Sequence, residues 1–230
     1  MAIRSYISIP TASYRVLGKN KGNVKVSSKV GRIDLKNKWI IESGKKVKYD
    51  ILLSTIPFEI FVKLARGLPK RFEEQISRVR YCPGVGLCFA TENFLNNKNY
   101  WINLFGERVH IIMQHSLLND VYGDKINWCL RYGGSEEDID LDEEEIKRLY
   151  LKDVKKYFPD VRIKWAKVFR TKFAEPIYDI HYPEYMPDYK TPVDGLYFAG
   201  IQLTYPKIRN MDVALESGMK AAKIILNNVT

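Results

Sequence analysis

The sequence predicts a fold of mixed class, in which an α/β part is combined with an α+β part. Three observations predict it. First, 46% of the 230 residues are hydrophobic, which is enough for one substantial core or two small ones. Second, the range 49–56 has the apolar run of a buried parallel strand, and 195–200 has that of a second buried strand. Third, the chain between them holds strand-like segments at hairpin spacing, which indicates an antiparallel sheet.

The first elements are expected to be short strands with tight connections. Apolar residues alternate with polar ones over 23–33, and a second run at 38–42 precedes a turn at Gly44. The apolar residues of 49–56 follow one another closely enough for a strand that is buried on both faces. Pro57 ends this strand, as expected for a central strand of a parallel sheet.

The middle of the chain is expected to begin with helices and to continue as a sheet. An apolar face predicts a helix over 58–65, and a more polar helix follows over 71–79. Strands are predicted at 85–90, 100–104, 109–115 and 126–132. An acidic run then leads into an amphipathic helix over 146–158, and a strand over 162–173 extends the sheet.

The last segment combines a buried strand with a long helix. The strand Gly-Leu-Tyr-Phe-Ala-Gly at 195–200 ends in glycine, and a helix is predicted over 211–228. Small residues recur along this helix at Ala214, Gly218, Ala221 and Ala222. We therefore expect a ligand or another backbone to lie against it.

The charge of the chain is strongly basic, with a net value of +10 and many lysines before residue 49. Such density favours anionic partners, but no helix-turn-helix, zinc finger or aromatic RNA-binding signature accompanies it, so no nucleic-acid partner is expected. The apolar runs are too short for a transmembrane segment, and the first ten residues are too polar for a secretory signal. We expect a cytoplasmic location.

The cysteines and histidines do not predict a metal site or a disulfide. Cys82, Cys88 and Cys129 form no close pair, so free thiols are expected. His110 and His115 are five residues apart in a strand-like run, which places them on opposite faces. A hydrolase has no support either, because there is no Gly-x-Ser-x-Gly elbow or paired-carboxylate spacing.

Three features of the C-terminal segment occur together: a strand that ends in Phe-Ala-Gly at 198–200, the run Met-Asp-Val-Ala-Leu-Glu-Ser-Gly at 211–218, and the pair Ala221 and Ala222. Together they closely resemble the FAD signature of the amine oxidase superfamily, which includes protoporphyrinogen oxidases. The stretches 24–33 and 49–57 match the same family in the expected order. The resemblance implies a Rossmann-like FAD-binding domain with an inserted, mainly antiparallel substrate domain that carries helices.

The resemblance also implies which residues contact FAD. The end of the 195–200 strand would approach the ribityl phosphate region, and the N-terminus of the last helix would point at the pyrimidine edge of the flavin. Backbone amides there would stabilise the negative charge that forms on reduction. The implied cofactor-binding residues are Val30, Thr55, Pro57, Gly200, Ile201, Met211, Asp212 and Val213. No residue is assigned as a catalytic acid or base.

Substrate-lining residues are expected on the antiparallel sheet and on the loop before the last helix. They are Trp101, His115, Arg131, Tyr132, Tyr205 and Arg209. Alternative interpretations stay open: Trp101 could pack in the core, Tyr205 could anchor its loop, and Arg209 could be a solvated charge.

One motif of the dinucleotide fold is missing from the sequence. No Gly-x-Gly-x-x-Gly follows a first strand, because the run Gly84-Val85-Gly86 lacks the third glycine and leads into a strand. Ile201 stands where many relatives have an acid. We therefore expect the chain to be the C-terminal portion of such a flavoprotein, truncated, split or degenerate, without this half of the fold. The expected domains are 1–57 with 191–230 for FAD and 58–190 for the substrate.

Three functions are compatible with these observations. The first is an FAD-dependent oxidoreductase that transfers a hydride from a small organic substrate, such as an amine, a porphyrinogen or a polyene, to the flavin. The second resembles UDP-galactopyranose mutase, on the basis of Thr204–Tyr205 and 210–212. The third is a non-catalytic binding or scaffold module. A complementary chain or self-association is expected, because an exposed sheet edge invites pairing.

Overall fold

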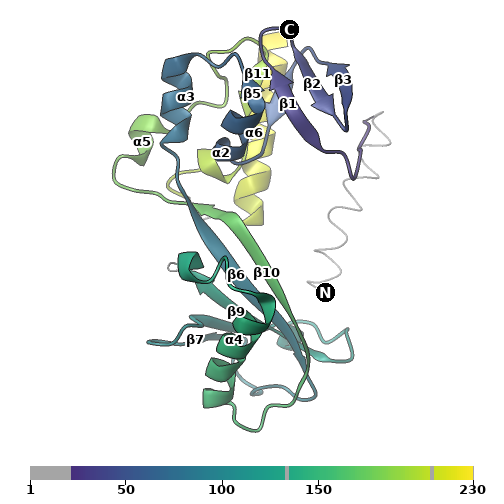
Figure 1. Ribbon diagram of the computed structural model, residues 1–230, viewed down its shortest axis with the longest axis vertical. Helices are drawn as coiled ribbons and strands as arrows, with labels where there is room; N and C mark the ends of the chain where they lie inside the picture. Colours follow the sequence, from purple (N-terminus) through teal and green to yellow (C-terminus); the bar gives the residue numbers. More distant parts are fainter. Residues whose placement is uncertain (1–21, 133–134, 208–209, 230) are drawn as a thin grey trace. The chain divides into compact units, whose positions relative to one another are not determined.

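The computed structural model describes residues 22–132, 135–207 and 210–229 and divides them into two compact units. The inserted unit is formed by Cys82–Ala174, and the described residues 22–25 are grouped with it. The discontinuous unit is formed by Val26–Tyr81 together with the segment that begins at Glu175. Figure 1 labels their helices and strands. The mixed α/β character expected from the sequence is confirmed.

The discontinuous unit holds a four-stranded sheet of order β3-β2-β1-β5 and a parallel pair, β11-β4. Its strands are β1 (Val30–Asp34), β2 (Trp39–Glu42), β3 (Lys45–Lys48), β4 (Leu52–Ser54), β5 (Ala65–Arg66) and β11 (Leu196–Phe198). Its helices are α2 (Phe58–Leu64), α3 (Lys70–Ser77), α5 (Tyr182–Tyr185) and α6 (Met211–Val229), with a 3-10 turn η3 (Ile201–Leu203).

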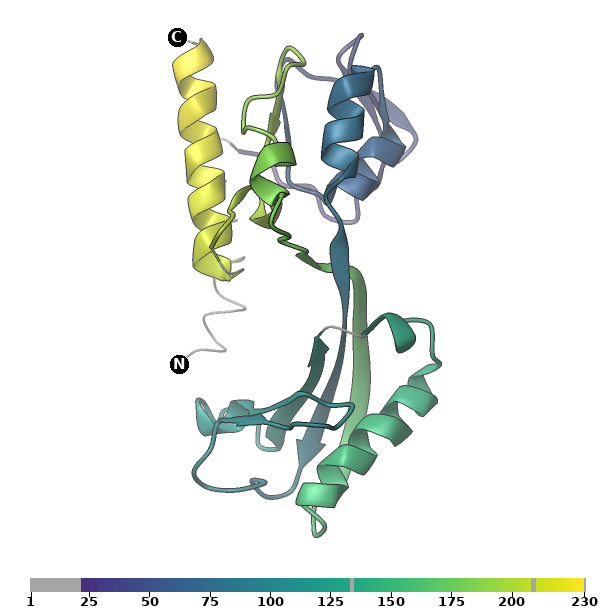
Figure 2. The same cartoon turned by 90° about the vertical axis from the view of Figure 1, so that its left-hand side faces the viewer.

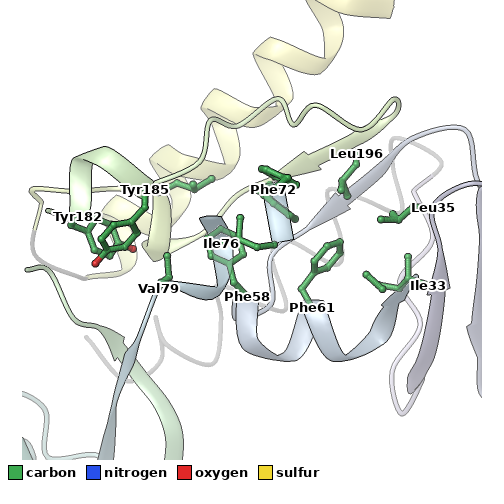
Figure 3. Close-up of a cluster of buried hydrophobic side chains, with 13 residues drawn as sticks. Ile33, Leu35, Phe58, Phe61, Phe72, Ile76, Val79, Tyr182, Tyr185 and Leu196 are labelled. Atoms are coloured by element: carbon green, nitrogen blue, oxygen red, sulfur yellow. The ribbon is translucent and has the colours of Figure 1, made fainter. Parts of the chain in front are cut away.

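Aromatic side chains from both segments of the discontinuous unit form its core (Figure 3). The ring of Phe198 on β11 lies 4.8 Å from that of Phe58 and 5.0 Å from that of Phe61, both on α2. Phe72 of α3 stacks on the same ring at 6.0 Å. Burial of each such side chain stabilises the unit by roughly 1.5–3 kcal/mol, so α2 and α3 are held against β11.

The inserted unit is a five-stranded sheet of order β10-β6-β9-β8-β7 with a helix on one face. Its strands are β6 (Tyr81–Thr91), β7 (Trp101–Asn103), β8 (Ile111–Gln114), β9 (Lys125–Tyr132) and β10 (Ile163–Pro176). The helix is α4 (Glu143–Tyr157), and two 3-10 turns are η1 (His115–Leu117) and η2 (Ser135–Glu137). The pairs β6/β9, β8/β9 and β7/β8 are antiparallel, which confirms the expected sheet.

Helix α4 covers one face of this sheet because its apolar stripe meets inward-facing strand residues (Figure 1). Ile146, Tyr150 and Val154 are fully buried against a core that includes Leu87 and Phe89 of β6. The carboxylate of Asp142 accepts a hydrogen bond from the Glu145 backbone N–H at 2.8 Å and caps the first turn. The acidic run therefore begins the helix, as expected.

Two features of the first strands differ from expectation. The strand expected over 23–33 begins only at Val30, and Val24 and Val26 are exposed. The strand over 49–56 is shorter and is paired in parallel with β11, as expected, but the prediction that it is buried on both faces is wrong. Ile51 and Leu53 are each 37% exposed.

Candidate flavin-binding site

Residues of the candidate site meet at the carboxyl edge of the parallel pair. Thr55 and Pro57 follow β4, and Gly200 and Ile201 follow β11, so all four lie where the two strands end. The backbone N–H of Ala199 donates to the Ser54 carbonyl at 3.0 Å and fixes this register. Ligands of open α/β sheets bind outside the carboxyl ends of the strands, so this edge has the expected geometry for a cofactor.

Gly200 and Ser217 fasten α6 to this edge. The Gly200 N–H donates to the Ser217 hydroxyl at 2.8 Å, and that hydroxyl donates to the Gly200 carbonyl at 3.3 Å. Gly200 has φ 125°, a conformation that other residues rarely adopt, and a Cβ atom there would lie 2.8 Å from the Gln202 side chain. Glycine is therefore required where the chain turns from β11 toward η3.

The first turn of α6 leaves backbone donors at the positive end of a 19-residue helix. The Asn210 side chain already accepts from the Val213 N–H at 2.8 Å. Helix geometry leaves the amides of Met211 and Asp212 without intrahelical acceptors. Of the three residues predicted to donate to the flavin, Val213 already uses its amide in the cap.

Three tyrosines that the sequence reasoning missed hold η3 in place. The hydroxyl of Tyr178 donates to the carbonyl of Ile201 at 2.7 Å, Tyr182 donates to that of Gln202 at 2.9 Å, and Tyr189 donates to that of Leu203 at 3.4 Å. Burial raises the pKa of Tyr178 and Tyr182, so both remain protonated donors at neutral pH. We call these three residues the tyrosine clasp. No pattern in the sequence singles them out, because they act on η3 through tertiary contacts.

The other predicted residues of the discontinuous unit lie in different surroundings. The ring of Tyr205 stacks on Tyr182 at 5.7 Å and meets Tyr178 edge-on at 5.2 Å, so it packs beside the tyrosine clasp. Val30 begins β1 and packs against the core of this unit. Arg209 lies outside the described residues.

The face of the five-stranded sheet opposite α4 is aromatic. Cross-strand register places Trp101 beside Met113 and Met113 beside Trp128. The Trp128 ring lies over Gly86, where a Cβ atom would be 3.7 Å from its Cε3 atom, and its centroid is 5.2 Å from that of Phe169. We call this the aromatic face, and it is formed by Trp101, Met113, Trp128, Trp165 and Phe169.

Arg131 does not join Trp101 on the aromatic face. It pairs with Val85, which is buried in the core beneath α4, and therefore projects to the α4 side. Its Nη1 atom donates to the buried Asp138 carboxylate at 2.7 Å, and Nη2 donates to Glu137 at 3.0 Å. A charged pair of this kind orients the local chain.

His115 and Tyr132 occupy two further places in the inserted unit. His115 begins η1, and its ring lies 6.4 Å from that of Tyr122. Burial lowers the pKa of His115, so it is neutral at pH 7. Tyr132 ends β9 opposite Gly84, and its side chain lies outside the described part of the structure.

The described residues show neither a cluster of metal ligands nor a membrane-spanning helix. In the ranges that the structure describes, no three His, Cys, Asp or Glu side chains are grouped closely enough to hold a metal ion. Cys82, Cys88 and Cys129 are free thiols, as expected. None of the described helices combines the length and the apolar composition needed to cross a bilayer.

Solved structures with a similar fold include an oxidoreductase, a mutase and a putative oxidase. An oxidoreductase from Methanosarcina mazei matches 91% of this chain and 52% of its own, with 17% identity and a TM-score of 0.73. A reduced UDP-galactopyranose mutase matches 91% and 49%, with 14% identity and a TM-score of 0.75. A putative protoporphyrinogen oxidase from Exiguobacterium sp. 255-15 matches 82% and 44%, with 13% identity and a TM-score of 0.65.

The chain spans about half the length of these structures. Their low identity shows a shared fold and no more. No match is found among curated proteins. The sequence itself matches the model of the flavin containing amine oxidoreductases over residues 6–226, and the resemblance seen in the C-terminal segment is thereby confirmed. The chain belongs to the flavin-containing amine oxidoreductase family.

Proposed function

We propose that this chain forms part of an FAD-dependent oxidoreductase and contributes the site for the redox-active ring of the flavin. The observation that carries the proposal is the meeting of two features at one edge. The carboxyl ends of β4 and β11 lie beside the N-terminal part of α6, which Ser217 ties to Gly200. Such an edge provides backbone donors for a bound ligand.

The described residues fit the flavin end of FAD. The amides of Met211 and Asp212 would hold the pyrimidine edge, and Thr55, Pro57, Gly200 and Ile201 would border the ring. Val30 would contact the adenine end. When bound, the flavin supplies a two-electron acceptor for a hydride released from a substrate C–H bond, and the substrate is oxidised. The positive end of α6 would stabilise the charge that accumulates on the acceptor.

Substrate binding is assigned in this proposal to the inserted unit. The aromatic face exposes Trp101, Trp165 and Phe169, which favour a flat, apolar organic substrate. Catalysis would rest on orientation and on the flavin, and the proposal assigns no acid or base.

A flavin titration tests the proposal. We expect the purified chain to retain FAD absorbance through gel filtration, and FAD at 100 times its dissociation constant to stabilise the chain by about 2.7 kcal/mol. Thr55→Arg should weaken binding at least tenfold, because it places a long side chain at the carboxyl edge. Thr171→Arg on β10 is the matched exposed control and should not change the affinity.

The alternatives predict other outcomes. Similarity to the UDP-galactopyranose mutase structure keeps a mutase-like reaction open, and product analysis with reduced protein and UDP-galactopyranose would detect it. A colourless protein that FAD neither binds nor stabilises would instead support a non-catalytic scaffold.

A further inference from the structure

Several of the lysines before residue 49 lie on or beside the sheet of β1, β2 and β3, and the proposed flavin function does not use them. Strand register places Ile33, Ile40 and Val47 in one row across these three strands. Ile33 and Ile40 pack in the core that includes Phe58 of α2, which lies in front of the purple strands in Figure 2. The alternate residues of the three strands therefore point away from that core and form the outer face of the sheet.

The outer face holds two cations against a tryptophan. Arg32 of β1 and Lys46 of β3 both pair with Ile41 of β2, so they lie in one row on this face. The Arg32 Cζ atom lies 5.4 Å and the Lys46 Nζ atom 4.6 Å from the centroid of the Trp39 ring. These cation–π contacts hold both charges on the outer face.

Lys48 adds a further charge to this face. It pairs with Trp39 and lies two residues after Lys46, so both lysine side chains point to the same side. Both are exposed, and neither forms an ion pair with another described residue. Asp34, which shares the face, accepts from the Asn37 N–H at 2.8 Å and serves its own turn. The two lysines are therefore available to an anionic partner.

Strand β3 is an edge of its sheet, whose order is β3-β2-β1-β5 (Figure 1). Directly after β3, the Tyr49 N–H donates to the Lys38 carbonyl at 3.1 Å, on the side of β2. The backbone groups of an antiparallel strand point alternately to its two sides, so those of Val47 also point to β2. The N–H and C=O groups of Lys46 and Lys48 point to the other side, where no described strand pairs with β3.

We propose that β3 binds an extended acidic segment of a partner protein. We call Lys46 and Lys48 the lysine edge. The segment adds a strand antiparallel to β3 and exchanges main-chain hydrogen bonds with these two residues. It carries Asp or Glu opposite each lysine, at alternate positions, because directly opposite residues share one face of a sheet. Trp39 holds Lys46 in place before binding, which lowers the entropic cost of the complex.

The charges of the lysine edge select against other strands. Lysines on an edge strand commonly prevent pairing with a further strand. In a two-fold antiparallel pair of β3 strands centred on Val47, Lys46 of one copy would lie opposite Lys48 of the other, and the like charges would repel. A neutral strand supplies no compensating charge. An acidic strand gains an opposite-charge pair at both positions, so the lysine edge distinguishes it from these competitors.

Other classes of anionic partner fit the outer face less well. A single-stranded nucleic acid stacks its bases on aromatic rings, whereas Arg32 and Lys46 already lie over the ring of Trp39. An anionic bilayer would attract the lysine side chains but cannot pair with the main-chain groups of β3. Main-chain hydrogen bonds at the lysine edge therefore identify an acidic strand as the occupant.

The experiment uses the full chain and a blocked threonine peptide with glutamate at two alternate central positions. We expect the peptide to slow hydrogen exchange at the Lys46 and Lys48 amides and to leave the Val47 amide, which points to β2, unchanged. The variant Lys46→Gln/Lys48→Gln should weaken binding about fivefold or more, because two opposite-charge cross-strand pairs are lost. An ionic strength of about 0.5 M should weaken binding to the native chain as well.

A charge-matched control separates the lysine edge from the net charge of the chain. Lys98→Gln/Lys223→Gln removes the same charge at exposed positions outside this sheet and should change the affinity less than about twofold. A peptide with glutamine in place of glutamate should bind the native chain about fivefold more weakly.

The proposal is overturned if the glutamate peptide does not bind, if it binds and leaves both lysine amides unprotected, or if the glutamine peptide binds equally well. It is also overturned if vesicles of phosphatidylcholine and phosphatidylserine, or an oligothymidylate, bind more tightly than the peptide and lose this binding in the Lys46→Gln/Lys48→Gln variant. A different class of partner would then occupy the outer face.

Discussion

Asp138 is a fully buried carboxylate in the inserted unit, and three side chains neutralise or bond to it. Arg108 and Arg131 form ion pairs with it, and the Tyr150 hydroxyl donates to its second oxygen at 2.8 Å. Burial raises the pKa of Tyr150, and the hydrogen bond to Asp138 raises it further, so the phenol remains a donor. These bonds connect the residue that follows η2 to β9 and to α4.

We predict that Asp138→Ala destabilises the inserted unit by about 3–5 kcal/mol, because it removes the anion that compensates Arg131. Denaturant unfolding followed by hydrogen exchange would measure this. The control is Asp140→Ala, whose exposed carboxylate lies 3.7 Å from Lys172 and should contribute less than about 1 kcal/mol. Equal losses in the two variants would contradict the assignment.

Ser217 has a corresponding role in the discontinuous unit. We predict that Ser217→Ala costs about 1–3 kcal/mol, since it leaves the Gly200 N–H without its acceptor. Chemical denaturation gives the value, and Ser77→Ala at the exposed end of α3 serves as the control. If the site is at this edge, Ser217→Ala should also weaken FAD binding.

The two histidines His115 and His181 should titrate on opposite sides of the ordinary value of about 6.5. Burial lowers the pKa of His115, whereas the hydrogen bond and charge of Glu184 raise that of His181. As the pH falls, His115 is therefore protonated in the unfolded chain before it is protonated in the folded chain. The free energy of unfolding consequently decreases as the pH falls below about 6.5. His181 stabilises the fold below 6.5 and loses this effect as the pH rises through its folded pKa.

An NMR titration of the imidazole protons would separate these two groups. We expect the midpoint of His115 to lie below that of His181. Glu184→Gln should lower the His181 midpoint and leave that of His115 in place. Coincident midpoints in the native protein would contradict both assignments.

At the scale of elements, β6 shows why glycines occur inside a strand. A Cβ atom on Gly84 would lie 2.9 Å from the Cβ atom of Ala174 on β10, so the two strands approach closely there. We predict that Gly84→Ala destabilises the protein by about 1–3 kcal/mol through overpacking. Gly31→Ala in β1 has no atom within 4 Å and should stabilise it by about 0.4–1 kcal/mol. Thermal melts of both variants provide the test, and the same sign for both would refute it.

Most elements could be predicted because periodicity is a local property. The helix around Ile146 and the strand pairs of the inserted unit follow from apolar spacing alone. The orientation of the Arg131 side chain toward α4 could also have been predicted, because strand alternation places it on the same face as the buried Cys129. The exposure of Leu53 could not be predicted. An apolar run indicates that a strand needs a covering layer, but it does not show whether that layer is present.

The tyrosine clasp shows the same limit for the candidate site. Tyr178 and Tyr182 donate to carbonyls of η3 that lie 23 and 20 positions further along the chain. These contacts form only when the chain has folded. Glycine at position 200 and the first turn of α6 could be assigned from the family resemblance, and their roles in binding FAD stay predictions. The hydrogen bonds that hold them required the structure.

At the scale of the whole molecule, the two hydrophobic cores are separate clusters. We therefore predict that unfolding is not a single two-state transition. Calorimetry should resolve two transitions, of which Asp138→Ala lowers one and Ser217→Ala lowers the other. Hydrogen exchange assigns each transition to its unit. A single transition that both variants shift equally would show that the two cores unfold together.

The order of the segments has a consequence for how the protein folds. The part Cys82–Ala174 of the inserted unit is continuous in sequence, and its first and last strands, β6 and β10, are neighbours. Once this part has folded, its flanking residues Tyr81 and Glu175 are held close together. The entropic cost of closing the loop between them has then been met. The length-dependent part of that cost is about 4 kcal/mol for a loop of this size. Contact order therefore favours formation of the inserted unit before β4 finds β11, and slow folding should be most evident in the parallel pair.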